Sequence, residues 1–401
     1  MNVTDTAFIF LCTILVFLMI PGLAFFYGGL VDGKNVVSVK LQSFVSLGIS
    51  TILWYICGYS LCFSGDVLGI IGNLDKAFLI GIGAGDLVPE TGLPVIMFIM
   101  FQLMFAVITP ALITGAFTHR ITFKSYLIFL VGWQFVVYYP LVHMLWGGGI
   151  LSQLGVLDFA GGIVVHISAG MAALAAVLFV GSRADTKLKP HNIPLFALGT
   201  ALLWFGWFGF NAGSALAMDV VAVQAFINTH VAAAVAATTW LVIEWLQTGK
   251  PKAVGFLTGS IAGLATITPA AGFVETYAAF IMGILAGSGC YAAVALKNKL
   301  GWDDALDVWG VHGVGGIIGT ICLGIFANRL VNAAGANGLL YGDSSFFFIQ
   351  LLAVLATAIY AFVITYLLLK IIDKITPVKV ESAEQIELDA VMHGEQAYIK
   401  D

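Results

Sequence analysis

The chain of 401 residues is 60% hydrophobic and only 10% charged, with a mean hydropathy of +1.01. Soluble domains carry about 25% charged residues, so this composition excludes an ordinary soluble domain and favours a protein that crosses a membrane several times. The small net charge of −5, without a basic cluster, gives no sign of a nucleic-acid partner. The five cysteines lie in apolar runs without metal-ligand spacing, so we expect neither a metal site nor a cofactor.

Eleven apolar segments are long enough to cross a bilayer, which takes about 20 residues. The first has no positively charged flank, so we expect a retained span and not a cleaved signal peptide. The approximate limits are 6–31, 42–63, 93–117, 123–143, 160–181, 193–215, 221–246, 253–270, 273–296, 305–328 and 346–371. The sequence therefore predicts an all-α polytopic membrane protein, with a transmembrane domain over 1–373 and a polar tail over 374–401.

The positions of the Lys and Arg residues test this number of spans. Fifteen of the 17 lie in the tail or in loops that follow odd-numbered segments, and only Lys76 and Arg329 lie in the other loops. A wrong number of spans would scramble this alternation. Because positive residues stay on the cytoplasmic side, we expect a multi-pass protein of the cell membrane, with its N-terminus outside and its tail inside.

The longest predicted outer loop contains GAGD, Gly83 to Asp86, a GxGD pattern that is also found in intramembrane aspartyl proteases. Such proteases need a pair of aspartates inside the membrane. Here the pattern lies outside every predicted span, and no second aspartate lies within one. The sequence therefore does not predict a protease, and we expect no enzymatic activity.

Two histidines lie at equivalent places in the predicted spans, His166 in the fifth and His312 in the tenth. His166 lies eight residues past Asp158, roughly 12 Å below the outer end of its helix, and His312 lies roughly 16 Å above the inner end of its own. Ionisable residues are costly in a bilayer and are usually functional there. An inverted repeat of segments 1–5 and 6–10 would bring both rings to one depth. Two unrelated packing residues are the alternative.

A third histidine within a span, His230 in the seventh, has no counterpart in the second span, which occupies the matching position of the first half. For His230 we expect a role in packing or in an outer vestibule.

Aromatic and polar residues gather near the predicted outer ends of the spans. Phe101 and Phe105 lie one helical turn apart on one face. Aromatic faces beside a hydroxyl suit a small cation, through cation–π attraction and a hydrogen bond. Core packing for the phenylalanines, an interfacial belt position for Trp146 and a helix N-cap for Asp158 are the alternatives, and a cap can coexist with a functional role. The residues of this group are Phe101, Phe105, Trp146, Asp158, Phe210, Asn211 and Ser214.

Over about residues 6–400 the chain resembles the ammonium transporter family Amt/Mep/Rh. The most specific stretch is DFAGGIVVHISAGMAALAAVLFVGSR, Asp158 to Arg183, which is similar to the family signature. PGLAFFYGGL, WFGFNAGSAL and DVWGVHGVGG support the resemblance, and HGEQAY in the tail favours the Amt branch.

The resemblance implies eleven helices, the eleventh peripheral, and a homotrimer with one pore in each subunit. It implies an outer ammonium site that captures the cation before it loses its proton, with ammonia then crossing an apolar pore. A neutral gas channel and an ammonium sensor remain alternative functions. The implied roles are Phe101, Phe105, Trp146 and Ser214 in the outer site, Asp158 in deprotonation or support, Phe105 and Phe210 as the gate, and His166 with His312 as the pore pair.

The tail can form an amphipathic segment that Gly394 ends. In the Amt branch this tail docks on the cytoplasmic face and couples neighbouring subunits, and a PII-family signal protein binds that face and blocks the inner exit. The resemblance implies the same here, whereas a frayed terminus is the alternative. The apolar residues expected on one side are Val380, Ala383, Ile386, Leu388 and Val391, and the basic residues expected beside the tail are Arg183, Lys187 and Lys189.

Overall fold

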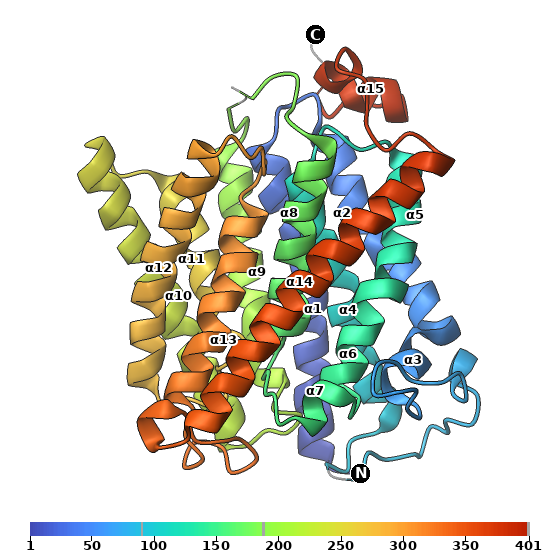
Figure 1. The fold of residues 1–401 in the computed structure, drawn as a ribbon, viewed down its shortest axis with the longest axis vertical. Coiled ribbons are helices and arrows are strands. Elements are labelled where there is room, and N and C mark those ends of the chain that lie inside the picture. Colours follow the sequence, from blue (N-terminus) through green and yellow to red (C-terminus); the bar gives the residue numbers. More distant parts are fainter. Residues whose placement is uncertain (90, 187–188, 399–401) are drawn as a thin grey trace.

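The computed structural model describes residues 1–89, 91–186 and 189–398. Over these residues the chain is helical, and its only β-type pairs are isolated bridges. Ten helical segments are long and apolar enough to cross a membrane, and Ala253–Ile267 is a shorter apolar helix. The predicted all-α membrane fold is confirmed. The N-terminus and the C-terminal tail lie at opposite ends of the bundle, as an odd number of crossings requires (Figure 1).

Each half of the chain supplies five crossings. The first half contains α1 (Val3–Leu30), α2 (Val36–Leu53) with η1 (Trp54–Gly58) and α3 (Tyr59–Phe63), α4 (Val95–Phe117), α5 (Phe123–Trp133) with η3 (Gln134–Tyr138) and α6 (Tyr139–Trp146), α7 (Ile150–Gln153), and η4 (Gly162–Ile167) with α8 (Ser168–Val180). The second half contains α9 (Ile193–Gly213), α10 (Val220–Thr248), α11 (Ala253–Ile267), α12 (Thr276–Lys299), and η5 (Trp309–Gly313) with α13 (Val314–Phe326). The remaining elements are η2 (Ala77–Leu79), η6 (Leu339–Tyr341), α14 (Ser344–Ile375), η7 (Glu384–Glu387) and α15 (Leu388–His393).

The two halves pack through equivalent helices. α1 lies along α9, the first helix of each half, and the fifth crossings contact one another reciprocally, α13 with η4 and α8 with η5. The backbones approach closely: a Cβ atom on Gly199 would overlap the backbone of Phe26. Small residues permit such contacts where lipid supplies no hydrophobic drive for helix association. This reciprocal packing is that of an inverted repeat.

The eighth crossing is shorter than its sequence predicts. The expected segment 253–270 is helical only over Ala253–Ile267, and Thr268 and Pro269 end it. Helices commonly end before a proline, because the ring restricts the preceding residue. The turn that follows is buried, and Asn228 donates to the carbonyl oxygens of Ala271 and Val274 at 2.9 and 2.8 Å. Irregular backbone is tolerated at membrane depth where protein satisfies it in this way.

The last long helix, α14, lies on the outside of the bundle and runs obliquely across it (Figure 1). Its 32 residues span about 48 Å at 1.5 Å per residue. A hydrocarbon core is about 30 Å thick, so tilt accommodates the excess length. The helix continues to Ile375, beyond the expected limit at residue 371.

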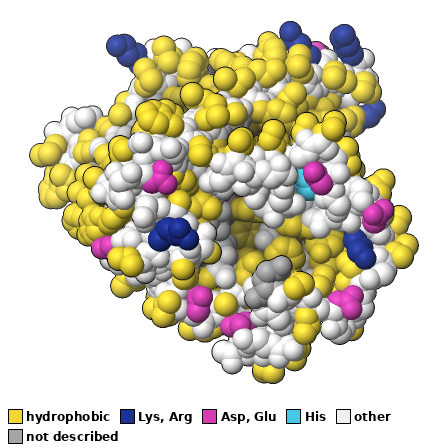
Figure 2. Space-filling view, turned by 60° about the horizontal axis from the view of Figure 1, so that its bottom comes forward, with side chains coloured by type: hydrophobic (Ala, Val, Ile, Leu, Met, Phe, Trp, Pro, Cys, Tyr) yellow, Lys and Arg dark blue, Asp and Glu magenta, His cyan; other side chains and the backbone are white. Residues whose placement is uncertain are grey.

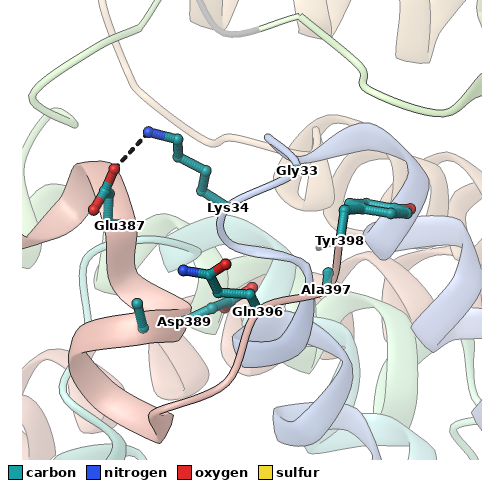
Figure 3. A pocket seen from close by; sticks show the side chains of 8 residues that line it. Gly33, Lys34, Glu387, Asp389, Gln396, Ala397 and Tyr398 are labelled. Carbon is teal, nitrogen blue, oxygen red and sulfur yellow. Dashed lines mark hydrogen bonds and ion pairs between the residues drawn. The ribbon is translucent and has the colours of Figure 1, made fainter. Parts of the chain in front are cut away.

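The tail packs against the end of the bundle opposite the N-terminus, but not as the expected amphipathic segment. Val380 and Leu388 are buried, whereas Ile386 and Val391 are more than half exposed, and Ala383 is also exposed. That prediction was wrong because η7 and α15 are short and polar groups anchor them. Gly394 does end the helix, with a left-handed φ of 68°. Figure 3 shows the tail against the Gly33–Lys34 turn, with the 2.6 Å ion pair between Lys34 and Glu387. Lys187 lies outside the described residues.

Candidate functional site

A cavity of about 510 Å³ opens at the N-terminal end of the bundle. Figure 2 looks toward this end and shows a depression near its middle. We call this cavity the vestibule. Its lining includes most of the residues expected at the outer mouth, together with Gln102 and residues of the loop before α14, which the sequence analysis did not single out. Its lining residues include Phe105, Trp146, Asp158, Phe159, Ser214, Asp219, Phe273 and Asn332.

Aromatic rings form the floor of the vestibule. The Phe105 ring lies 5.9 Å from Trp146, edge to face at 86°, and 4.4 Å from Phe210, with the distances measured between ring centroids. Phe105 and Phe210 are both buried and come from α4 and α9, one from each half. Phe101 lies behind Phe105, at 5.1 Å and fully buried, and is not part of the vestibule lining.

Two polar groups face the vestibule beside these rings. The Ser214 hydroxyl donates to the carbonyl oxygen of Phe210 at 2.9 Å, which leaves the oxygen lone pairs free to accept a hydrogen bond. The Trp146 indole N–H donates to the carbonyl oxygen of Asp158 at 3.0 Å, which fixes the ring over the cavity. The vestibule thus offers the Ser214 hydroxyl oxygen and several aromatic faces to a small donor cation.

Asp158 is a buried helix cap. Its two carboxylate oxygens accept four backbone N–H groups, from Gly161, Gly162, Ile163 and Val164, at 2.7 to 3.1 Å. Burial raises the pKa of Asp158, and the four N–H groups oppose that shift. A carboxylate has about four lone-pair directions, and the backbone occupies them all. Asp158 therefore supports the mouth and has no free oxygen lone pair for a proton.

The structure brings His166 and His312 together. The Nδ1 atoms lie 3.2 Å apart, and the rings are nearly parallel, 5.2 Å apart at 18°. Both lie in π-helical turns, η4 and η5, at the start of the fifth crossing of each half. Such turns are often found at functional sites. His166 and His312 lie at the same depth because each occupies the same place in its half of the repeat.

Glycines allow the two crossings to meet at the histidines. A Cβ atom on Gly170 would overlap the backbone of Gly313, and one on Gly316 would lie 3.0 Å from the His166 Cβ. On the vestibule side, Trp207 stacks on His166 at 5.4 Å and 22°. The sequence analysis missed Trp207, although it precedes Phe210 by three residues and so shares its helix face.

The histidines line a narrow cavity of about 10 Å³, comparable to one water-sized probe. Its other walls are mostly aliphatic and aromatic, and Phe210 borders it on the vestibule side. His312 and Phe26 also line a further cavity of about 190 Å³, which Arg183 and Asp307 border toward the tail end. The vestibule, the histidine cavity and this inner cavity thus follow one another along the bundle.

A second aspartate repeats the position of Asp158. Asp304 precedes His312 by eight residues, as Asp158 precedes His166, and accepts the Trp309 N–H at 2.7 Å. Burial raises the pKa of Asp304 to about 6. The equal spacing was visible in the sequence, so Asp304 could have been found as the repeat partner of Asp158.

His230 does not line the vestibule. It is exposed on the surface of the bundle and packs on Trp204, 5.6 Å away. It lies ten residues into α10, about 15 Å along the helix. The expected vestibule role is therefore not supported, and His230 lies on a packing face.

Buried charges join the loops at the tail end. Arg183 binds Asp303 with contacts as short as 2.7 Å, and Arg120, wholly buried, lies 3.5 Å from the same carboxylate. Burial tends to raise the pKa of Asp303, but the hydrogen bonds from Arg183 hold it below its usual value. Burial and the two arginines lower the pKa of the neighbouring His119 to about 3. This network fixes the rim of the inner cavity.

Comparisons with known proteins agree with this architecture. The sequence model of the Ammonium Transporter Family matches residues 7–398. An ammonium transporter of Bacillus subtilis is 49% identical, with 99% of each chain covered. The solved structure of Candida albicans Mep2 superposes with a TM-score of 0.90 at 36% identity, over 96% of this chain and 88% of that one. A solved structure described as a sensor Amt protein gives 0.89 at 30% identity, over 97% and 98% of the two chains. The chain belongs to the ammonium transporter family and is a multi-pass membrane protein.

Proposed function

We propose that the chain captures ammonium in the vestibule, that the cation releases its proton to vestibule water at the Phe105–Phe210 pair, and that ammonia then passes the histidines to the inner cavity. The observation that carries this proposal is the series of three cavities, with the phenylalanine pair between the first two and His312 shared by the last two.

The energetics favour conduction of the neutral molecule. Moving a bare ion into a medium of low dielectric constant costs on the order of 20 kcal/mol by the Born estimate. The histidine cavity is mostly apolar and about as small as one water-sized probe, so it holds no hydration shell to offset this cost. Ammonia avoids most of the penalty.

The vestibule suits the cation instead. The Trp146 and Phe105 rings attract a positive charge through their π faces, and the Ser214 hydroxyl oxygen accepts one of the ammonium N–H groups. The rings and the hydroxyl oxygen attract sodium as well, but only ammonium can also donate a hydrogen bond to Ser214, and this hydrogen bond favours ammonium. Asp158 acts as a support, since its oxygens hold the backbone.

The histidine pair offers ammonia matched hydrogen-bonding groups without a fixed charge. If one Nδ1 donates to the other, the donor ring has an accepting Nε2 and the accepting ring carries its proton on Nε2. The pair therefore presents one acceptor and one donor to the bore. The His166 Nε2 is buried without a hydrogen-bond partner among the described residues, as this role requires.

The proposed orientation places the vestibule outside and the tail in the cytoplasm, following the Lys and Arg distribution. We also propose the homotrimer. A histidine exposed near the middle of a membrane helix is costly toward lipid, and a neighbouring subunit would cover His230. A PII-family protein at the tail face is the proposed regulator.

A sensor role is the second candidate, because one similar structure is described as a sensor Amt protein. The two functions differ in the expected rate of uptake, since a sensor need not move ammonium at a useful rate.

The test is uptake of labelled methylammonium into proteoliposomes, with ammonium and sodium as competitors. Trp146→Leu should raise the KM and weaken the preference for ammonium over sodium, because it removes a cation–π face worth about 0.5–2 kcal/mol. Asp158→Ala should abolish uptake, because four buried N–H groups lose their acceptor. Normal uptake by the assembled Asp158→Ala variant would mean that the carboxylate is only a local cap. Negligible uptake by the wild type would favour the sensor.

A further inference from the structure

A buried histidine with two hydrogen-bond partners lies close to the vestibule wall. His143, on α6 three residues before Trp146, is fully buried. Its Nδ1 lies 3.0 Å from the carbonyl oxygen of Cys62, and its Nε2 lies 3.0 Å from a carboxylate oxygen of Asp66. Neither residue lines the vestibule, and the transport steps above do not use them.

The contacts with Cys62 and Asp66 limit how the His143 ring can hydrogen-bond. A carbonyl oxygen and a carboxylate oxygen only accept hydrogen bonds, so both contacts form together only when both ring nitrogens carry a proton. Asp66, whose side chain is 49% exposed, is thus the hydrogen-bond partner of His143 on the side away from Cys62. The hydrogen bond from His143 is the main reason that the pKa of Asp66 lies below its usual value.

Further hydrogen bonds of His143 and Asp66 hold the turn that follows Trp146. The carbonyl oxygen of His143 accepts the N–H groups of Gly147 and Gly149 at 3.1 and 3.0 Å. Asp66 accepts the Gly69 N–H at 2.8 Å, and the Gly69 carbonyl oxygen accepts the Ile150 N–H at 2.8 Å. The loop after α3 and the turn after Trp146 are thus joined on both sides of the His143 ring.

We propose that His143, held by Asp66, is a positioning residue that sets the Trp146 ring over the vestibule and thereby controls the affinity for ammonium. Trp146 is held at two points, its indole by the Asp158 carbonyl and its backbone by the turn fastened to His143. If the turn that holds the Trp146 backbone is loosened, the indole ring can shift. The shift weakens the capture of ammonium and leaves the pore beyond the gate intact. The proposal rests on the proposed capture site.

The test is the KM and Vmax of methylammonium uptake in proteoliposomes, normalised to assembled protein. Asp66→Ala should raise the KM about two- to twelvefold, the range expected for one hydrogen bond of about 0.5–1.5 kcal/mol, with Vmax within about twofold of wild type. Asp66→Ser, whose side chain is too short to reach Nε2, should behave alike. Asp66→Asn should restore the KM, because its amide can donate to a neutral Nε2.

Two comparisons make the result specific. Asp75→Ala is the matched control, since Asp75 is an exposed acid of the same loop whose side chain contacts Asn73, and its KM should not change. The double variant Asp66→Ala/Trp146→Leu should match Trp146→Leu alone, because residues that act through one another are not additive.

Each contrary result has one meaning. An unchanged KM in Asp66→Ala, with a raised KM in Trp146→Leu, overturns the role of His143 alone. If the KM increases of the two single variants multiply in the double variant, the role of His143 is also overturned. The same holds if both Asp66→Ala and Asp66→Ser fail to assemble, because the pair would then be a general structural contact. An unchanged KM in Trp146→Leu overturns the proposed capture site itself.

Discussion

At the scale of single residues, the two repeat-related aspartates show how burial changes a carboxylate. Asp158 accepts four backbone N–H groups, whereas one carboxylate oxygen of Asp304 accepts the Trp309 N–H and the other is buried without a partner among the described residues. Burial and the nearby Asp307 raise the pKa of Asp304 to about 6, while Lys297 opposes the shift. The folded protein therefore holds this proton more strongly than the unfolded chain does.

This difference predicts a pH dependence of stability. Between pH 3.8 and about 6 the folded state keeps the Asp304 proton while the unfolded state has lost it, so stability falls as the pH rises through this window, by at most about 1.4 kcal/mol per pH unit. Asp304→Asn should lack that loss. The unfolding temperature of the variant in detergent, relative to that of wild type, should therefore increase between pH 4 and 7. Asp75→Asn, an exposed acid at the other end of the bundle, is the control. Parallel curves for wild type and Asp304→Asn would contradict the shift.

At the scale of helices, the crossing of α8 and η5 decides whether the histidines meet. Gly170 and Gly313 touch backbone to backbone at this crossing. A methyl group there would push apart the two turns that carry His166 and His312, since packed interiors have no spare volume.

Gly170→Ala should therefore lower uptake by at least about tenfold, since displacements of about 1 Å at a functional site can cost a hundredfold. Gly48→Ala, in α2, is the matched control, because a Cβ atom there meets nothing within 4 Å and alanine favours a helix by about 1 kcal/mol. Uptake and unfolding temperature are measured for both variants. Equal uptake by the two would show that the crossing tolerates a methyl group and that the histidine separation is not critical.

The accuracy of the prediction from sequence also differs from element to element. Spans and depths were predictable because hydrocarbon thickness and helical rise are fixed, which placed His166 and His312 at one level before any contact was known. The position of Phe101 behind Phe105 and the exposure of Ile386 depend on which neighbour covers each residue, whereas the end of α11 at Ile267 follows from Pro269. The His143–Asp66 contact joins a helix end to an irregular loop, and no periodic pattern encodes such a pair.

At the scale of the whole molecule, the tail joins parts of the chain that lie far apart in sequence. Asp389 accepts the N–H groups of Val37 and Ser38, both at 2.8 Å, and so caps α2. Asn35, at the usual capping position, does not cap its own helix; its side chain binds Gln385 and Leu388 of the tail instead. The second crossing therefore takes its cap from a residue near the other end of the chain.

The tail also reaches the loop before α9. The Tyr398 hydroxyl lies 2.8 Å from His191 Nε2, and His191 Nδ1 lies 2.8 Å from the carbonyl oxygen of Val31. Since Nδ1 faces an acceptor, it carries the ring proton, and in the neutral ring Nε2 accepts from Tyr398. One side of the tail is thus tied to α2 and the other to the start of α9, and Figure 3 shows Asp389 and Tyr398 on either side of the cavity between them.

Deleting residues 380–401 should lower uptake and abolish binding of a PII-family protein in membranes, because α2 loses its cap and the proposed binding face loses one wall. Asp389→Ala should give part of the defect, since losing a helix cap costs about 0.5–2 kcal/mol. Glu381→Ala, an exposed acid of the same tail, is the control and should behave as wild type. Both activities are measured on the same membrane preparations. If the deletion leaves uptake and PII binding unchanged, the tail is only a terminus; if uptake alone falls, the tail acts through α2 and the regulator binds elsewhere.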